Sequence, residues 1–444
     1  MDNWTSLNDP NLYLYLTGEN HTLTINGKTF NVTWDDDAKE FTIKDEAGNV
    51  ISADNGGTPT TPKSEVVITP EVVADSAGKA TANVTENEIS AAIESAQSQK
   101  VGTIVIAPDV TGTVSNVTVT LPAKSAQDLG DAKIVILIQT DLGEITLSTE
   151  ALKEEIAGAV GNSTLSITID TDALGTTKIA LGIGGKSIDH LSIAIKIKLP
   201  VPDTLMVPLA PLPGLSGTMS PHLAVYLNGA NGNKLIKKSL IINNTAYFLL
   251  NGTAEVTIAE NSKTFSDVKS DDWFYNEASF AASHELFLGV SENEFAPNMP
   301  MTRAMLVTVL WRLESNPSSV AAAFDDVESG IWYSDAIAWA AENGIVDGIG
   351  DNEFNPNGDV TREQLATMLY RYAKHLGMDT SATADLSVYT DGGKTSSWAA
   401  DAMKWAVGSG IITGTSTTTV DPQGAATRAQ VATMLTRMIA IIVR

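Results

Sequence analysis

A block of sequence that occurs three times with fixed internal spacing constrains the fold of this chain more than any other feature. In each copy a tryptophan precedes a proline by 24 residues and an arginine by 30 residues. Differences in length fall between the copies rather than inside this frame. Such constancy is typical of one supersecondary unit used repeatedly, so we expect three equivalent units. Their marker residues are Trp273, Pro297 and Arg303; Trp332, Pro356 and Arg362; and Trp398, Pro422 and Arg428.

Each copy is predicted to fold as helix, loop and helix. The first helix follows the tryptophan and carries a buried apolar stripe, for which Ala336 and Ile337 are examples. Gly344 and Gly410 predict left-handed C-terminal caps for this helix. The first copy has Glu285 at the equivalent position, so we expect a different cap there.

The second helix of each copy is predicted to begin at a threonine. An arginine follows that threonine directly, and it lies at the positive end of the helix macrodipole, which costs about 0.3–1 kcal/mol. A glutamine at the third helical position completes a capping box in two of the copies. The N-caps are Thr302, Thr361 and Thr427; Gln364 and Gln430 complete the boxes, and Met305 cannot.

An unfavourable arginine that recurs three times suggests an anion nearby. A helix N-terminus offers free N–H groups to an anion, and a guanidinium adds a planar fork that suits a carboxylate. We therefore expect the three arginines to contact a ligand. The alternative is that each arginine pairs inside the protein with Asp267, Asp326 or Asp391. The tryptophans likewise have two interpretations, stacking on a sugar ring or packing in the core.

The motifs "FxDV…W", "NGIV.G" and "TRxQ" in this order resemble the S-layer homology (SLH) domain family, over about 180 residues from Phe265 onward. The resemblance implies an all-α, pseudo-threefold, three-pronged spindle of helix-loop-helix units. It also implies grooves that bind a secondary cell-wall polysaccharide, commonly one that carries pyruvate ketals. The family pattern ends in "TRAE", and Met305, Gln364 or Gln430 stands in place of its glutamate. The polysaccharide-binding residues implied are Arg303, Arg362, Arg428, Asp267, Asp326, Asp391, Trp273, Trp332, Trp398, Gly289, Gly348 and Gly414. Because only the second copy keeps every motif, its groove is predicted to bind best.

The chain before the repeats is predicted to be β-rich. Residues 1–53 read as a small β unit, 54–64 as a Gly/Pro/Thr linker, and 65–262 as a sandwich-like β domain with few helices. Thr85 and Glu88 predict a capped helix in that domain, and a second helix is expected over residues 149–160. The repeats are assigned to residues 265–320, 324–380 and 389–444.

Composition limits the possible partners. The formal net charge is −25, which argues against nucleic acid and against anionic membrane surfaces. No apolar run is long enough for membrane insertion, and residues 1–16 do not have the pattern of a signal peptide. From Phe265 onward the chain has 23 acidic and 11 basic residues. Recognition of an anionic polymer is therefore expected to be local to specific grooves.

The sequence predicts no catalytic residue, no metal site and no cofactor. There is no cysteine, and the five histidines are scattered without ligand spacing. We therefore expect a non-catalytic extracellular protein, attached to the cell wall through its SLH repeats and possibly part of a surface layer. The alternative is the C-terminal anchoring fragment of a wall-attached glycan hydrolase whose catalytic domain lies upstream. Lateral self-association stays open.

Overall fold

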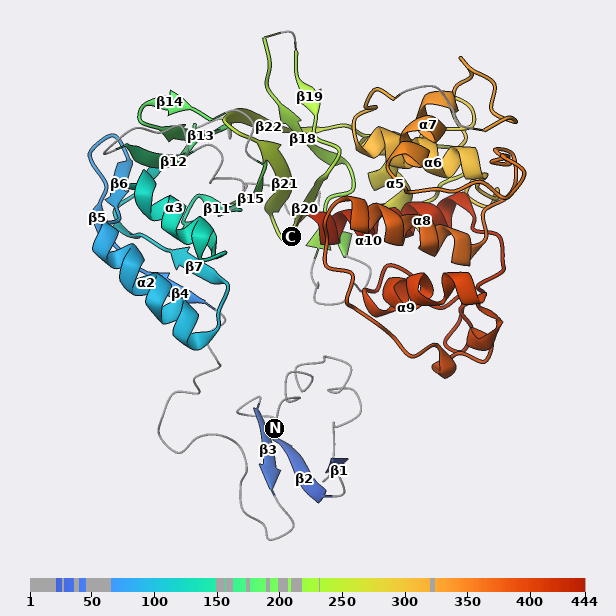
Figure 1. The fold of residues 1–444 in the computed structure, drawn as a ribbon, viewed down its shortest axis with the longest axis horizontal. Coiled ribbons are helices and arrows are strands. Elements are labelled where there is room, and N and C mark those ends of the chain that lie inside the picture. Colours follow the sequence, from blue (N-terminus) through green and yellow to red (C-terminus); the bar gives the residue numbers. More distant parts are fainter. Residues whose placement is uncertain are drawn as a thin grey trace. The chain divides into compact units, whose positions relative to one another are not determined.

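The computed structural model describes two compact units, residues 1–64 and residues 65–444 (Figure 1). In the first unit it describes the backbone of three strands. In the second it describes residues 65–148, 156, 163–172, 176–188, 192–198, 207–208, 218–230, 232–319 and 324–443. The predicted linker over 54–64 lies outside the described residues, as does all but Ile156 of the helix expected over 149–160. The domain boundaries within 65–444 stay predictions.

The first unit contains a three-stranded antiparallel sheet in the order β1-β2-β3. Its strands are β1 (His21–Ile25), β2 (Lys28–Asp35) and β3 (Glu40–Lys44). β1 pairs along its whole length with β2, and β2 pairs with β3 across a short connection. The alternating stretches that predicted a small β unit therefore form strands.

Among its described residues, the β-rich part of the second unit contains two large sheets, a two-stranded sheet of β5 and β8, and two full helices besides the helical residue Ile156. One sheet has nine strands in the order β16-β17-β20-β21-β15-β11-β10-β7-β4, and the other contains β19-β18-β22-β13-β12-β9-β6 with β14 beside β13. The helices are α2 (Glu86–Gln99) and α3 (Ala123–Asp131). The strands are β4 (Val66–Ile68), β5 (Glu71–Val73), β6 (Lys79–Asn83), β7 (Thr103–Ile106), β8 (Asp109–Thr111), β9 (Asn116–Pro122), β10 (Val135–Thr140), β11 (Gly143–Leu147), β12 (Thr164–Thr171), β13 (Thr177–Ile183), β14 (Lys186–Ser187), β15 (Ser192–Lys198), β16 (Val207–Pro208), β17 (Thr218–Met219), β18 (Leu223–Leu227), β19 (Lys234–Leu235), β20 (Ser239–Ile242), β21 (Thr245–Asn251) and β22 (Ala254–Glu260).

Alternating side chains of both sheets bury one common core. Val119 of β9 and Ile136 of β10 belong to opposite sheets, yet both lie in the same cluster of buried residues. Period-two alternation places every second side chain on that face, which is why the threonines of β9 remain on the other face. Thr85 is the N-cap of α2. Its side chain accepts from the Glu88 N–H, and the Glu88 carboxylate accepts from the Thr85 N–H. The expected β-rich architecture and its capped helix are confirmed.

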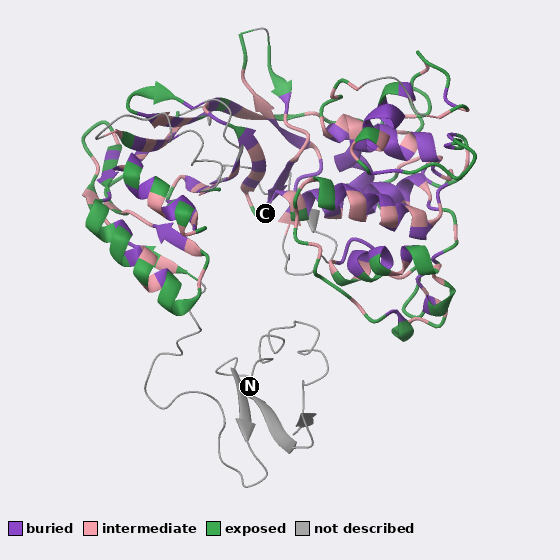
Figure 2. Cartoon of the chain, viewed as in Figure 1, coloured by how far each residue is buried: buried purple, intermediate pink, exposed green. Residues whose placement is uncertain are grey.

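The C-terminal part is helical, with two α-helices in each copy of the repeat. The first helices are α5 (Tyr275–Ser283), α7 (Ser334–Glu342) and α9 (Ala400–Gly408). The second helices are α6 (Arg303–Leu313), α8 (Arg362–His375) and α10 (Arg428–Ile442). Short 3-10 turns η3 (Leu386–Val388), η4 (Gly392–Lys394) and η5 (Ser397–Ala399) precede α9. Figure 2 shows the buried residues concentrated where these helices face one another.

The predicted caps of these helices are present, with one correction. Each N-cap threonine accepts a hydrogen bond from the third helical N–H, and capping boxes form at α8 and α10. Gly344 and Gly410 adopt the expected left-handed conformation, with φ of 66° and 72°. The different cap expected at Glu285 is wrong, because Glu285 adopts φ of 55° and makes the same turn without being glycine.

Three buried backbone segments join the copies in a closed ring. The Met301 N–H donates to Ala426 O at 2.9 Å, the Ala426 N–H donates to Val360 O at 2.8 Å, and the Val360 N–H donates to Met301 O at 2.8 Å. Each of these residues directly precedes the N-cap threonine of its copy. The starts of α6, α8 and α10 are therefore held together at one point.

The β-rich part and the repeats share a packed junction inside the second unit. β20 packs against α10, and Leu240 belongs to the same buried cluster as the repeat helices. His284 is fully buried beside β20, with its imidazole Nε2 3.2 Å from Ser239 Oγ. Burial lowers the pKa of His284 to about 4, so the ring is neutral at neutral pH. Lys238 forms an ion pair with Glu314 at 2.6 Å across this junction.

Candidate functional site

The three arginines each reach into the next copy of the repeat. Arg303 donates from Nε to Phe354 O at 2.7 Å and from Nη2 to Asp347 O at 2.9 Å. The other two repeat this geometry with N···O distances of 2.6–2.8 Å. The acceptors are Val420 O and Thr413 O for Arg362, and Phe295 O and Leu288 O for Arg428. Copy one thus bonds to copy two, two to three, and three back to one.

The first N–H groups of these helices are not free, which corrects the anion-site expectation. The N–H groups of Arg362 and Glu363 donate to Gly424 O and Pro422 O of the following copy, at 2.9 and 2.8 Å. The third N–H of the same helix donates to the Thr361 hydroxyl. The same carbonyl positions accept from α6 and α10. The start of each helix is therefore satisfied by protein, and any anion would have to be bound by side chains.

The three aspartates support the loops that accept from the arginines. Asp326 accepts from the N–H groups of Phe354 and Asn355 at 2.8 and 2.7 Å. Phe354 thereby donates its N–H to Asp326 and accepts at its carbonyl from Arg303. Asp267 and Asp391 hold the equivalent loops in the same way. Their carboxylates are used on backbone N–H groups, so the alternative of direct pairing with the arginines does not describe these aspartates.

The three glycines lie where a side chain would not fit. A Cβ on Gly348 would lie 2.7 Å from Glu353 O, within the turn that returns to the Phe354 loop. Gly289 and Gly414 have the same steric limit, at 2.8 Å from Glu294 O and 2.7 Å from Thr419 O. Real Cβ contacts of that length are not tolerated without movement of the backbone. These glycines therefore shape the loop that the arginine of the preceding copy contacts.

The three tryptophans lie on the surface. Trp273, Trp332 and Trp398 are 65%, 59% and 58% exposed, whereas most large apolar side chains of the repeats are buried. Core packing, the other interpretation of these residues, is therefore wrong. A flat aromatic face open to solvent is a feature that can stack on a ring-shaped ligand. Trp398 and Trp273 each line a cavity together with an arginine.

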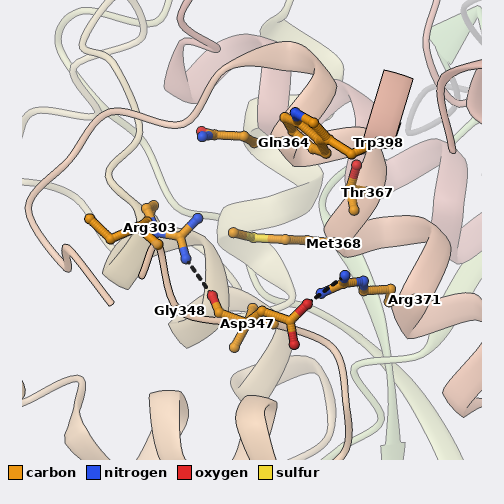
Figure 3. Close-up of a pocket in the computed structure, with 10 residues that line it drawn as sticks. Arg303, Asp347, Gly348, Gln364, Thr367, Met368, Arg371 and Trp398 are labelled. Carbon is orange, nitrogen blue, oxygen red and sulfur yellow. Dashed lines mark hydrogen bonds and ion pairs between the residues drawn. The ribbon is translucent and has the colours of Figure 1, made fainter. Parts of the chain in front are cut away.

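Groove 1 is assembled from all three copies and has a volume of about 380 Å³ (Figure 3). Arg303 comes from copy one, the loop at Asp347 and one face of α8 come from copy two, and Trp398 comes from copy three. Asp347 connects two arginines, because its carbonyl accepts from Arg303 and its carboxylate pairs with Arg371 at 2.6 Å. Groove 1 is lined by Arg303, Val346, Asp347, Gly348, Ile349, Gln364, Thr367, Met368, Arg371 and Trp398.

Groove 2 is lined by similar side chains, each supplied by the copy that follows the one supplying it in groove 1. Its volume is about 480 Å³. Copy two supplies Arg362, copy three supplies one face of α10, and copy one supplies Trp273 and Glu277. The side chain of Arg437 occupies the place that Arg371 has in groove 1, and its Nη1 donates to Thr413 Oγ1 at 3.2 Å. Groove 2 is lined by Trp273, Glu277, Arg362, Thr413, Gly414, Thr415, Gln430, Thr433, Met434 and Arg437.

The third equivalent position is more apolar than the other two. Leu288 stands where groove 1 has Asp347, and Met305 stands where it has Gln364. Leu288 and Val290 are 56% and 47% exposed there. Arg428 and Trp332 complete the equivalent set. The three copies therefore place the same arginine and tryptophan around surfaces of different polarity.

Arginine occurs only in the repeats, and almost always at two recurring positions. All seven arginines of the chain lie from residue 303 onward, and six of them occupy two places in each copy. The region as a whole is acidic, so the grooves concentrate positive charge on a negative surface. Burial lowers the pKa of Arg303 and Arg362, and burial followed by the neighbouring Arg312 lowers that of Arg428 to about 10. All three remain protonated at neutral pH.

The second arginine of each copy was missed by the motif analysis. Arg312, Arg371 and Arg437 each follow the first arginine by nine residues. The same spacing in three copies was a detectable signal. Since nine residues is two and a half helical turns, the two arginines were not expected on one face of one helix. They meet because they line grooves formed between different copies.

Comparison with known proteins identifies the class of the repeats. Residues 264–304, 323–366 and 388–432 match the S-layer homology domain family. The C-terminal part of the chain therefore consists of three tandem S-layer homology domains, as the motifs indicated. The match covers these three segments and not the β-rich part before them.

Particular relatives include both surface-layer proteins and enzymes. An amylopullulanase of Thermoanaerobacterium thermosulfurigenes is 26% identical over 72% of this chain and 19% of its own length. An exoglucanase of Acetivibrio thermocellus is 29% identical over 40% of this chain and 16% of its own. A surface-layer 125 kDa protein of Lysinibacillus sphaericus is 30% identical over 34% and 13%. The chain thus spans less than a fifth of each of these relatives.

No helix in the described part of the chain has the length and apolar character needed to cross a lipid bilayer. Helices α7 and α8 instead bury most of their apolar side chains in the common core and carry exposed residues at Asp335, Glu342, Lys374 and His375.

Proposed function

We propose that this chain is a non-catalytic cell-surface protein whose S-layer homology domains bind an anionic secondary cell-wall polysaccharide, of the pyruvate-ketal type, in grooves 1 and 2. The single observation that supports this most is the composition of these grooves. Each combines two arginines, an exposed tryptophan and hydroxyl and amide side chains. Aromatic stacking suits the face of a sugar ring, and guanidinium groups suit a carboxylate.

The pseudo-threefold spindle implied by the family is part of this proposal. Its support is the ring of backbone hydrogen bonds through Met301, Val360 and Ala426, together with the three equivalent arginine contacts. In such an arrangement a groove lies between neighbouring copies rather than within one. A ligand bound in groove 1 would contact side chains from all three copies.

The experiment that tests the function is co-sedimentation of the full chain with cell-wall sacculi, with and without their secondary polymer. The variants are Trp398→Ala for groove 1 and Trp273→Ala for groove 2, because these exposed side chains can be removed without opening the core. Each is expected to weaken binding by about tenfold, and the double variant to abolish it. Trp332→Ala is the matched control of equal exposure, and we expect a smaller loss because its surroundings are apolar.

The arginines are unsuitable for a first test of binding. Each holds two copies together, so its removal would affect folding as well as the groove. Sedimentation that persists after removal of the polymer, or in the double tryptophan variant, would rule out glycan binding in these grooves. Loss of sedimentation in the folded double variant, with the polymer present, would support it.

A second candidate function rests on the relatives described as an amylopullulanase and an exoglucanase. Because this chain spans less than a fifth of each, we infer the alternative that it is the anchoring part of a longer wall-attached enzyme. Sequencing of the complete gene decides between the two candidates. A catalytic domain upstream of residue 1 would favour the enzyme, and an open reading frame without one would favour the non-catalytic surface protein.

A further inference from the structure

Groove 2 contains a buried carboxyl group that the other copies lack. Glu277 lies four residues after Trp273 on α5, and its side chain is only 4% exposed. The equivalent residues are Ala336 and Ala402. Glu277 nevertheless belongs to the lining of groove 2, together with Arg362 and Arg437.

The arginine opposite Glu277 is incompletely bonded. Arg437 Nε is buried and donates to no described residue, whereas Nη1 donates to Ile411 O and Thr413 Oγ1. Among the described side chains no hydrogen bond or ion pair joins Glu277 to Arg437. In groove 1 the equivalent Arg371 is paired with the Asp347 carboxylate at 2.6 Å. The two grooves therefore differ in how their second arginine is neutralised.

The surroundings of Glu277 control its charge. α5 packs against α10, which contributes Arg437, and α8 contributes Arg362 at the far side of the cavity. The remaining lining side chains of groove 2 are uncharged. Burial raises the pKa of Glu277, and a hydrogen bond from its own backbone N–H and the field of Arg437 oppose this only in part. The carboxyl group thus takes up a proton at a higher pH than a solvated glutamate does.

We propose that Glu277 determines the ligand preference of groove 2, because its ionised carboxylate repels an anionic sugar substituent that approaches Arg437 and its protonated form does not. This inference rests on the proposed function, since it concerns the same anionic glycan. Groove 1 has Ala402 in this place, so it has no carboxyl group equivalent to Glu277 and its affinity does not depend on such a proton. The chain then holds one groove whose affinity is independent of mild acidification and one whose affinity increases with it.

The Coulomb interaction explains the direction of this effect. A ligand carboxylate that enters groove 2 at neutral pH would lie near an ionised Glu277 in a partly desolvated cavity, where like charges repel strongly. Protonation removes that repulsion and leaves the positive charges of Arg362 and Arg437 at the groove. In groove 1 no buried carboxyl group corresponds to Glu277, and the Asp347 carboxylate pairs with Arg371.

The test measures binding of a defined probe, the 4,6-pyruvate ketal of a methyl hexoside, to the full chain by isothermal titration calorimetry. Groove 2 is isolated with Trp398→Ala and groove 1 with Trp273→Ala. We expect the groove 2 protein to bind about tenfold more tightly at about pH 5.5 than at about pH 8, and the groove 1 protein to change little. Adding Glu277→Gln to the groove 2 protein should give tight binding at both pH values.

The control variant Glu277→Ala supplies the residue found in the other two copies. Because the same probe is used throughout, any titration of its own carboxyl group appears in every variant and cancels in the comparison. Equal pH dependence with glutamate, glutamine and alanine at position 277, or none in any of them, would overturn the role of Glu277 and leave the proposed function intact. Failure of the probe to bind any protein at either pH would overturn both.

Discussion

Each arginine at the start of a second helix makes hydrogen bonds whose stabilisation exceeds the cost of a cation at the positive end of the helix macrodipole. Arg362 gives up about 0.3–1 kcal/mol to the macrodipole, but it makes two charge-assisted hydrogen bonds to backbone carbonyls of the next copy, one of them buried. Bonds of this type contribute about 1.5–3 kcal/mol each. Arg303 gains more, since its guanidinium also lies 4.4 Å from the centre of the Phe354 ring. Val420 replaces that ring beside Arg362.

Replacement of Arg362 by alanine is expected to lower the free energy of unfolding by about 2–4 kcal/mol. Arg362→Lys should recover little of this loss, because an ammonium group cannot present two donors in the geometry of Nε and Nη2. Urea unfolding followed by circular dichroism measures both changes, with the exposed Lys404→Ala as control. A lysine variant as stable as the unaltered chain would show that charge alone, rather than the fork, holds the copies together.

At the scale of the helix, copy one differs from the others in its C-terminal cap. Glu285 is exposed and adopts φ of 55°, where copies two and three have glycine. A side chain costs about 1–2 kcal/mol in the left-handed region, and glycine does not. The packing that follows, through Leu286 and Phe287 in the core, holds this turn in place despite the strain.

Glu285→Gly is therefore expected to raise the free energy of unfolding by about 1 kcal/mol. The matched change Gly344→Ala, at the equivalent turn of copy two, should lower it by a similar amount. Both are measured by chemical unfolding of the full chain at neutral pH. If Glu285→Gly were neutral or destabilising, the Glu285 side chain would contribute an interaction at the junction with the β-rich part that exceeds the strain.

Local elements were predictable because their signals lie within a few residues. Threonine caps, the Thr85–Glu88 capping box and the alternation in β9 all depend on neighbours in sequence. The acceptors of Arg428 lie 133 and 140 residues away and are backbone carbonyls, which every residue possesses. No residue pattern marks such an acceptor. For the same reason the exposure of Trp398 and the order of strands in the sheets could not be read from the sequence.

At the scale of the whole repeat region, two properties follow from closure of the ring. First, every groove contains side chains from more than one copy, so motif comparison copy by copy cannot rank the grooves. The statement that copy two binds best therefore stays a prediction, because no groove belongs to copy two alone. Second, grooves 1 and 2 each contain two arginines, although the region as a whole has more acidic than basic residues. Recognition of an anionic glycan would then depend only modestly on salt, because it relies on local contacts.

The ring also predicts how the region unfolds. A chain that ends after residue 380 loses Arg428, and with it the hydrogen bonds to Leu288 O and Phe295 O, as well as the bond from Met301 N–H to Ala426 O. Copies one and two would then each lose the contacts that they make with copy three. We expect circular dichroism to show a loss of helix well beyond the share of α9 and α10, and hydrogen exchange to show little protection in α6 and α8. Retention of a cooperative transition in the shortened chain would mean that two copies suffice, as in an open solenoid. A single transition of the complete region, lost on removal of any one copy, is the behaviour that a closed ring of mutual contacts requires.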